Sequence, residues 1–216
     1  MTHQERQAYS KAVILQAAMD EFGSRDYNQV NMETICKNHC ISKGMMYHYY
    51  SNKDELFLLC AQKTFDDLKV YVEQNMTTSG TEDPLQHIQH YFMIRESFFQ
   101  LYPLQKRVFE TALFRTPEHL KDDIRTLREP IRQLNLAFLE QLTSDIPLRP
   151  GLNRNLVTHY LENIESLFRE VVFCAHPEKG SQDLHTVLET VTEVLDIFLF
   201  GVLQQNSNKS DWRNTR

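Results

Sequence analysis

The stretch Ser42-Lys-Gly-Met-Met-Tyr-His48 places several chemically distinct groups within about two helical turns. Ser42 is positioned to cap a helix, whose first backbone amides can then face a phosphate. Lys43 supplies a positive charge, and Gly44 lets the backbone approach a partner closely because it has no side chain. Tyr47 and His48 offer a hydroxyl and a ring N–H to phosphate oxygens. These groups are of the kinds that can contact a nucleic acid, although aromatic clusters of this type usually pack a small core.

The apolar residues beside them are expected to divide between the same surface and the core. Of Met45 and Met46, one is expected to touch a thymine methyl group and the other to pack inside. Tyr49 is expected in the core, because an aromatic ring there can fasten the short helix to the first helix of the chain.

Helices must position these groups, since glycines and prolines fall mostly between long segments with helical apolar spacing. No alternation long enough for a sheet is present, so the chain is predicted to be all-α. Asn31 and Ser42 are placed to cap two short helices, Ser51 or Asn52 caps a longer one, and Pro130 should kink or split another. The expected helices cover 3–22, 32–39, 43–47, 53–76, 84–101, 103–114, 117–144, 154–175 and 183–205.

Composition and charge narrow the possible locations and partners. The 216 residues are 41% hydrophobic, and their longest nearly unbroken apolar run, 197–203, is too short to span a membrane. The first residues lack an apolar signal stretch, which predicts a cytoplasmic protein. Residues 1–53 carry a net charge of +1 and the remainder −7. DNA responds to the face presented to it, so the acidic total of −6 does not exclude binding by the N-terminal part.

Three short motifs follow one another closely in the sequence: Ile41-Ser-Lys-Gly44, Tyr47-His-Tyr49 and Lys53-Asp-Glu-Leu56. With the apolar residues of 14–27 that precede them, they make the first quarter of the chain resemble the DNA-binding domain of the TetR family. The resemblance implies a dimeric transcriptional regulator, usually a repressor, which a small molecule releases from its operator.

The resemblance also implies roles for residues outside the short stretch. Lys53, in the first turn of the long helix, would contact a phosphate, and Asn31 and Thr34 would do the same at the preceding helix. Cys40 stands where the family usually has a turn glycine. The predicted DNA contacts are Asn31, Thr34, Ser42, Lys43, Gly44, Met45, Tyr47, His48 and Lys53.

This interpretation divides the chain into three parts. Residues 1–52 would form a three-helix, helix-turn-helix DNA-binding domain with its motif at 31–50. Residues 53–205 would form a larger helical domain for effector binding and dimerisation, and 206–216 a flexible tail. A double-stranded operator with an inverted repeat is the expected partner, because a two-fold symmetric dimer matches a palindrome.

Segment 84–101 is apolar around most of its circumference and should be central and buried. With later aromatic residues it either lines an apolar effector pocket with a few polar anchors or forms an ordinary core, and both possibilities stay open. The candidate pocket residues are His87, Tyr91, Phe92, Arg95, Phe98, Phe99, Tyr102, Phe109, Phe138 and His159.

Two C-terminal segments carry apolar stripes wider than one neighbouring helix requires. They pack within the chain or form a four-helix interface between two subunits, and the family resemblance favours the interface. The candidate residues are Leu156, Tyr160, Ile164, Leu167, Val171, Leu184, Val187, Leu188, Val191, Leu195 and Phe198.

Other kinds of site find little support. The chain has no G-x-G-x-x-G, Walker A, H-E-x-x-H or G-x-S-x-G motif, so it is not expected to be an enzyme. Cys36, His39 and Cys40 lack a second pair of ligands, so no metal or cofactor is expected. Two alternatives remain: a DNA-bound architectural or protein-partner module that needs no effector, and a helical interaction module that does not touch DNA.

Overall fold

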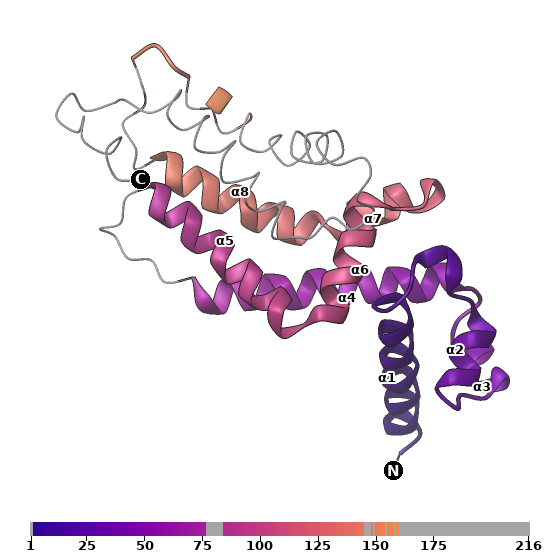
Figure 1. Ribbon diagram of the computed structural model, residues 1–216. Helices are drawn as coiled ribbons and strands as arrows, with labels where there is room; N and C mark the ends of the chain where they lie inside the picture. Colours follow the sequence, from indigo (N-terminus) through magenta and orange to yellow (C-terminus); the bar gives the residue numbers. More distant parts are fainter. Residues whose placement is uncertain are drawn as a thin grey trace, which may run out of the picture. The chain divides into compact units, whose positions relative to one another are not determined.

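The computed structural model describes residues 2–76, 84–144, 148, 150–153, 155–157 and 159, and these residues are predominantly helical (Figure 1). The predicted all-α class is confirmed. The helices are α1 (His3–Phe22), the 3₁₀ turn η1 (Tyr27–Gln29), α2 (Met32–Asn38), α3 (Lys43–Tyr49), α4 (Lys53–Asn75), α5 (Pro84–Leu101), α6 (Pro103–Phe114), the 3₁₀ turn η2 (Glu118–Leu120), α7 (Lys121–Leu127) and α8 (Glu129–Ser144). The expected helix at 183–205 and most of that at 154–175 lie outside the described residues.

Side-chain caps explain where the short helices begin. The Asn31 side-chain oxygen accepts a hydrogen bond from the backbone amide three residues on at 2.8 Å, and Ser42 Oγ accepts the equivalent bond at 3.1 Å. Asn52 caps α4 by accepting from the Glu55 amide at 3.0 Å, and the Glu55 carboxylate accepts from the Ser51 amide at 2.8 Å. Both predicted caps are confirmed, and Asn52 is the cap of α4.

Pro130 splits the expected segment 117–144, as predicted. The segment becomes η2, α7 and α8, with α7 ending at Leu127 and Pro130 in the first turn of α8. A proline has no N–H to donate, and the first turn of a helix is where that donor is not needed.

The chain forms two compact units, which divide it within α5 and α8. Unit 1 comprises Met1–Asn75 and Ile94–Arg132, and unit 2 comprises Met76–Met93 and Gln133–Arg216. In unit 1, α4 packs on α1, α6 and α7, and α1 also packs on α2, α3 and α6. None of the helices in the described ranges is long and apolar enough to cross a membrane.

Aromatic side chains fill the core of unit 1. The ring of Phe57 on α4 meets the rings of Phe22 and Tyr27 edge to face, each at 5.2 Å between centroids. Farther along α4, Phe65 meets Phe109 of α6 at 5.8 Å. These contacts fix α1 and α6 against α4, and α4 thereby supports the short helices α2 and α3 through α1.

Gly23 lets the end of α1 approach α6 closely. It caps α1 with an ordinary φ of −76°, so no unusual backbone conformation requires a glycine there. A Cβ atom at Gly23 would lie 2.7 Å from both Leu104 Cβ and the Met19 carbonyl oxygen. The packing of α6 on α1 therefore excludes a side chain at this position.

Candidate nucleic-acid interface

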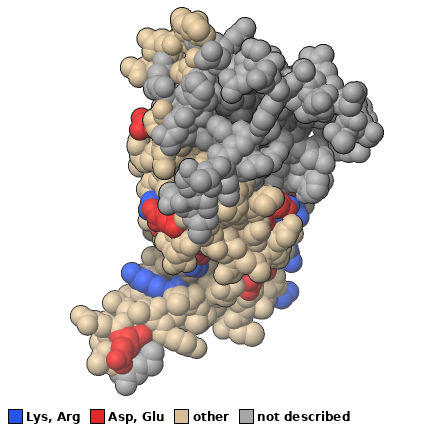
Figure 2. Space-filling model, turned by 90° about the vertical axis from the view of Figure 1, so that its left-hand side faces the viewer, with Lys and Arg blue, Asp and Glu red and all other residues tan. Residues whose placement is uncertain are grey.

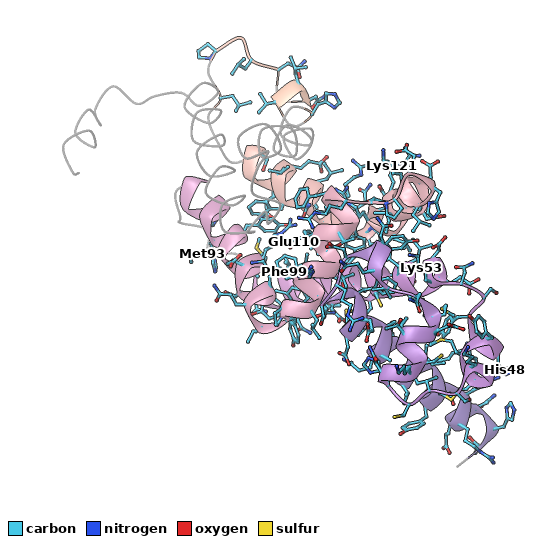
Figure 3. All side chains as sticks on the ribbon, turned by 45° about the vertical axis from the view of Figure 1, so that its right-hand side comes forward. His48, Lys53, Met93, Phe99, Glu110 and Lys121 are labelled. Carbon is cyan, nitrogen blue, oxygen red and sulfur yellow. The ribbon has the colours of Figure 1, made fainter. Side chains whose placement is uncertain are left out.

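Helix α3 presents a mostly exposed surface held by one buried side chain. Met46 is fully buried, whereas Lys43, Gly44, Tyr47 and His48 are exposed. Figure 3 shows the His48 ring pointing outward from α3. Met46 therefore supplies the expected core contact, and the partly exposed Met45 is left for the expected apolar contact with DNA.

The turn between α2 and α3 keeps the left-handed geometry that a glycine would normally adopt. Cys40 has a φ of 54°, and the Ile41 amide donates to the Cys36 carbonyl oxygen at 3.0 Å. An L-residue in this conformation costs about 1 kcal/mol or more relative to glycine. The turn therefore forms even though Cys40 stands in place of a glycine, and the Cys40 thiol is exposed on it.

Lys43 forms an ion pair with Glu33 of α2 across the turn. Both side chains are exposed, so water and salt screen the pair. The hydrogen bond and charge of Lys43 lower the pKa of Glu33, and the same contact raises the pKa of Lys43. A phosphate bound by Lys43 would have to displace the Glu33 carboxylate, which repels the phosphate.

Lys53 lies at the first turn of α4, and its ammonium group faces the turn that precedes α2. Its Nζ donates to the carbonyl oxygens of Tyr27 at 3.0 Å and Val30 at 3.3 Å, and it lies 4.2 Å from the centre of the Tyr27 ring. Val30 immediately precedes Asn31, the cap of α2, and Asn31 Oδ1 also accepts from the Thr34 hydroxyl at 2.9 Å. Lys53 therefore fastens the start of α2 to α4.

Tyr49 is not in the core as expected, because its ring is only partly buried. It is the last residue of α3, and Met46, one turn earlier, already fills the buried position. The Tyr49 ring instead packs against the His48 ring at 4.7 Å, and Lys11 Nζ lies 5.8 Å from its centre.

A buried carboxylate, which sequence reasoning missed, joins α1 to the end of α2. Glu21 is 5% exposed and accepts a hydrogen bond from Asn38 Nδ2 at 2.6 Å. Its carboxylate also lies 3.4 Å from His39 Nε2 and 3.4 Å from an Arg25 guanidinium nitrogen. The available signal was its helical spacing, since Glu21 follows the buried residues Ala17 and Ala18 by four and three positions.

A second polar network ties η1 to later parts of unit 1. The Tyr27 hydroxyl donates to Asp54 of α4, and His119 of η2 lies 2.9 Å from the other Asp54 oxygen. Burial, followed by the hydrogen bond to Asp54, raises the pKa of Tyr27. The Tyr27 hydrogen bond, more than His119, lowers the pKa of Asp54. On the same turn, Asp26 pairs with Arg107 and Arg115 of the α6 region at 3.3 and 3.5 Å.

The candidate pocket residues fall into two packed groups. In unit 1, Phe98, Phe99 and Phe109 are buried and pack ring against ring, with Phe99 and Phe109 at 4.7 Å. In unit 2, Tyr91 stacks on Phe138 at 4.3 Å. Among the other candidates, Arg95 and His87 are half-buried, Tyr102 and His159 are exposed, and the Phe92 side chain lies outside the described part.

Leu156 is the one candidate interface residue in the described part of the chain, and it is 47% exposed. The other ten candidates lie outside the described residues. The predicted interface therefore stays a prediction, as does the boundary at residue 52.

On one face of the described part of the chain, charged side chains of both signs are interspersed (Figure 2). On this face, small groups of Lys and Arg lie among acidic and uncharged residues, and no broad basic stripe is visible in the described part of that face.

Several solved structures share this fold. FadR from Bacillus halodurans, a fatty acid degradation regulator, gives a TM-score of 0.62 at 15% identity over 86% of this chain and 94% of its own. A TetR family transcriptional regulator from Chloroflexus aurantiacus gives 0.57 at 17% identity over 92% and 95%. NalD from Pseudomonas aeruginosa, the secondary repressor of the MexAB-OprM multidrug efflux pump, gives 0.58 at 16% identity over 94% and 100%.

The part of the chain that matches a known protein family includes the candidate interface. No curated protein matches the chain significantly. Residues 14–60, which include α2, α3 and the first turns of α4, match the model of the bacterial regulatory proteins of the tetR family. The sequence match to this family is thus confined to residues 14–60, while the fold over most of the chain is shared with solved structures of TetR family regulators.

Proposed function

We propose that the chain is a homodimeric repressor that binds a palindromic operator and leaves it when a small molecule binds. The observation that carries the proposal is α3, which is capped by Ser42, anchored by Met46 and exposes Lys43, Gly44, Tyr47 and His48. A helix with one buried edge and a polar exposed face is what insertion into a major groove requires.

We assign the phosphate contacts to Asn31, Thr34, Ser42, Lys43 and Lys53, with Tyr47 and His48 as further donors. These contacts position the protein without reading sequence, and Gly44 and Met45 are left to approach base edges. NalD is a repressor, which supports repression as the outcome of binding.

The proposed dimer presents two copies of α3 to one operator. Helices of this class read half-sites about 34–36 Å apart, so two symmetric subunits match an inverted repeat. An effector then needs only to favour a state in which the two copies no longer match that spacing.

Selection of duplexes from a random library by the full-length chain tests the DNA-binding proposal. We expect enrichment of an inverted repeat and, by sedimentation velocity, two chains per bound duplex. Enrichment of no sequence, or a stable monomer at micromolar concentration that binds a single half-site, would contradict the dimeric repressor.

Thermal melting in the presence of apolar and amphipathic small molecules tests the effector proposal separately. A ligand that binds only the folded chain raises the melting temperature by mass action. We expect at least one compound to raise the melting temperature and to release the selected operator. If no compound does so, the effector-independent DNA-bound module is the better description.

A further inference from the structure

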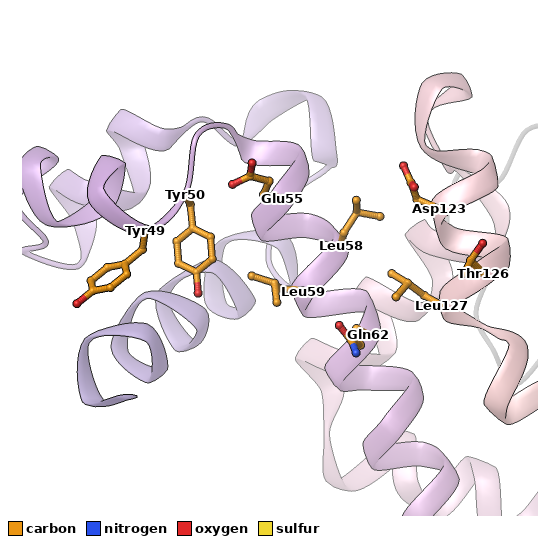
Figure 4. A pocket seen from close by; sticks show the side chains of 9 residues that line it. All are labelled: Tyr49, Tyr50, Glu55, Leu58, Leu59, Gln62, Asp123, Thr126 and Leu127. Atoms are coloured by element: carbon orange, nitrogen blue, oxygen red, sulfur yellow. The ribbon is translucent and has the colours of Figure 1, made fainter. Parts of the chain in front are cut away.

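A groove of about 450 Å³ lies where α3, α4 and α7 meet within unit 1. Tyr49 and Tyr50 border it at the end of α3, and Leu127 of α7 lines it on the far side of α4 (Figure 4). Its volume is within the range of pockets that hold small organic molecules. None of the residues proposed for DNA contact lines it, and none of the candidate effector residues does so.

Leucine side chains make part of the groove apolar. Leu58 and Leu59 of α4 lie between the two tyrosines and Leu127 (Figure 4). Burial raises the pKa of the Tyr50 phenol, so this group is neutral at neutral pH. An occupant must therefore have an apolar or aromatic body to replace water on this surface.

The charges in the groove all have one sign. Glu55 and Asp123 place two carboxylates among its lining residues, and none of these residues is a lysine, arginine or histidine. One oxygen of Glu55 accepts from the Ser51 amide, while Asp123 is exposed and is paired with no residue in the described part of the chain. Carboxylates beside tyrosine rings attract cations, through charge and through the ring faces.

We propose that this groove is a binding site for a lipophilic organic cation, with its apolar body on Leu58, Leu59 and Leu127 and its charge near Asp123 and Glu55. An occupant would contact both the end of α3 and α7, which the sequence separates by about 75 residues. The site is distinct from the apolar pocket predicted around segment 84–101.

Isothermal titration calorimetry of the full-length chain with (biphenyl-4-ylmethyl)trimethylammonium tests the site. The probe for comparison is biphenyl-4-ylmethanesulfonate, which has the same body and the opposite charge. We expect the cation to bind at least tenfold more tightly than the sulfonate. Equal affinities, or no binding of the cation up to millimolar concentration, would overturn the proposal.

Two substitutions on α7 locate the binding. Asp123→Asn should weaken binding of the cation about two- to fivefold, as expected for loss of one solvated charge contact. Thr126→Trp should block the groove, because Thr126 also lines it and is exposed. Asp122→Asn is the matched control, since Asp122 is on the same helix but pairs with Arg125 at 2.9 Å. Equal effects of Asp122→Asn and Asp123→Asn, or undiminished binding by Thr126→Trp, would place the cation elsewhere.

Occupation of the groove has a consequence for operator binding. This consequence rests on the proposed function and is tested by a separate measurement. Because the occupant contacts Tyr49 and Tyr50, it should change the affinity of the chain for its selected operator, and Thr126→Trp should abolish that change. An unchanged operator affinity at saturating cation would reject this coupling, while calorimetry alone decides whether the site exists.

Discussion

Single side chains on α2, α3 and α4 determine how much positive charge the candidate surface offers to DNA. Lys43 is engaged by Glu33, and the Lys53 ammonium group is engaged by two backbone carbonyls. Two of the predicted phosphate contacts are thus occupied within the chain. The Lys43–Glu33 ion pair is exposed and screened, so a phosphate can replace it. The contacts of Lys53 support the start of α2.

Glu33→Gln should strengthen operator binding. The substitution removes a negative charge beside Lys43, so Lys43 becomes available to a phosphate, and we expect roughly a three- to tenfold lower Kd at low salt. Fluorescence anisotropy of a labelled operator, repeated over a range of NaCl concentrations, measures the effect. Glu118→Gln, which removes a carboxylate paired with Lys121 near α7, is the control and should leave the Kd unchanged.

Lys53→Ala separates the two roles of Lys53. Loss of its bonds to Tyr27 and Val30 should reduce the free energy of unfolding by about 1–2 kcal/mol, measured with urea. If Lys53 also contacts a phosphate, the slope of log Kd against log salt should fall by about one for every DNA sequence. A changed stability with an unchanged slope would make Lys53 a positioning residue only. Lys37→Ala, an exposed residue of α2, serves as the control.

The short helices are positioned through local caps and through the tight packing of α1, α4 and α6. Their beginnings follow from neighbouring residues, such as Ser42 with the amide of Met45. Their placement follows from close contacts between elements, such as that of Gly23 with Leu104. Close packing therefore excludes a side chain at Gly23, whereas no neighbouring element excludes one at Gly44.

A pair of alanine substitutions tests that difference. Gly23→Ala should reduce the free energy of unfolding by about 1–3 kcal/mol, because its Cβ meets α6 and the backbone of α1. Gly44→Ala should not destabilise the chain, since no atom lies within 4 Å of the added Cβ, but it should weaken operator binding. Urea unfolding and anisotropy measure the two effects. Unimpaired operator binding by Gly44→Ala would remove Gly44 from the proposed contact surface.

Local signals predicted the elements of unit 1 well, because caps and proline act over three or four residues. Asn31, Ser42 and Pro130 therefore marked real helix boundaries. The sequence left open which of Met45 and Met46 packs inside, and the prediction of Tyr49 in the core was wrong, because Met46 and Tyr49 both fit the apolar face of α3. The contacts of Lys53 and Asp54, and the groove between α3 and α7, depend on residues far apart in the sequence, which no periodicity brings together.

On the scale of unit 1 as a whole, polar contacts join the helices proposed to bind DNA to segments much later in the chain. Asp54 connects Tyr27, which lies before α2, to His119 of η2. Asp26 connects the same turn to Arg107 and Arg115. A movement of α6 or η2 would therefore act directly, through these polar contacts, on the turn that precedes α2.

Asp54→Asn should destabilise the chain at neutral pH and have little effect in acid. The pKa of Asp54 is lowered in the folded chain, so its stabilising charge is present above the ordinary aspartate pKa and is lost as the pH falls through the folded value. Urea unfolding should show the difference from the unsubstituted chain shrinking between about pH 5 and pH 2. Asp122→Asn, whose carboxylate is exposed, should show no such change.

The seven residues of α3 also limit how much sequence one subunit can recognise. At 1.5 Å per residue the helix is about 10 Å long, which corresponds to about three base pairs. Four distinguishable base pairs carry at most about two bits per position, so one α3 supplies about six bits and the proposed dimer about twelve. Finding one site among on the order of 10⁶ competitors requires about twenty bits. The remaining information has to come from outside α3. The shape and deformability of the operator can supply it, so we expect base pairs that α3 never touches to affect binding.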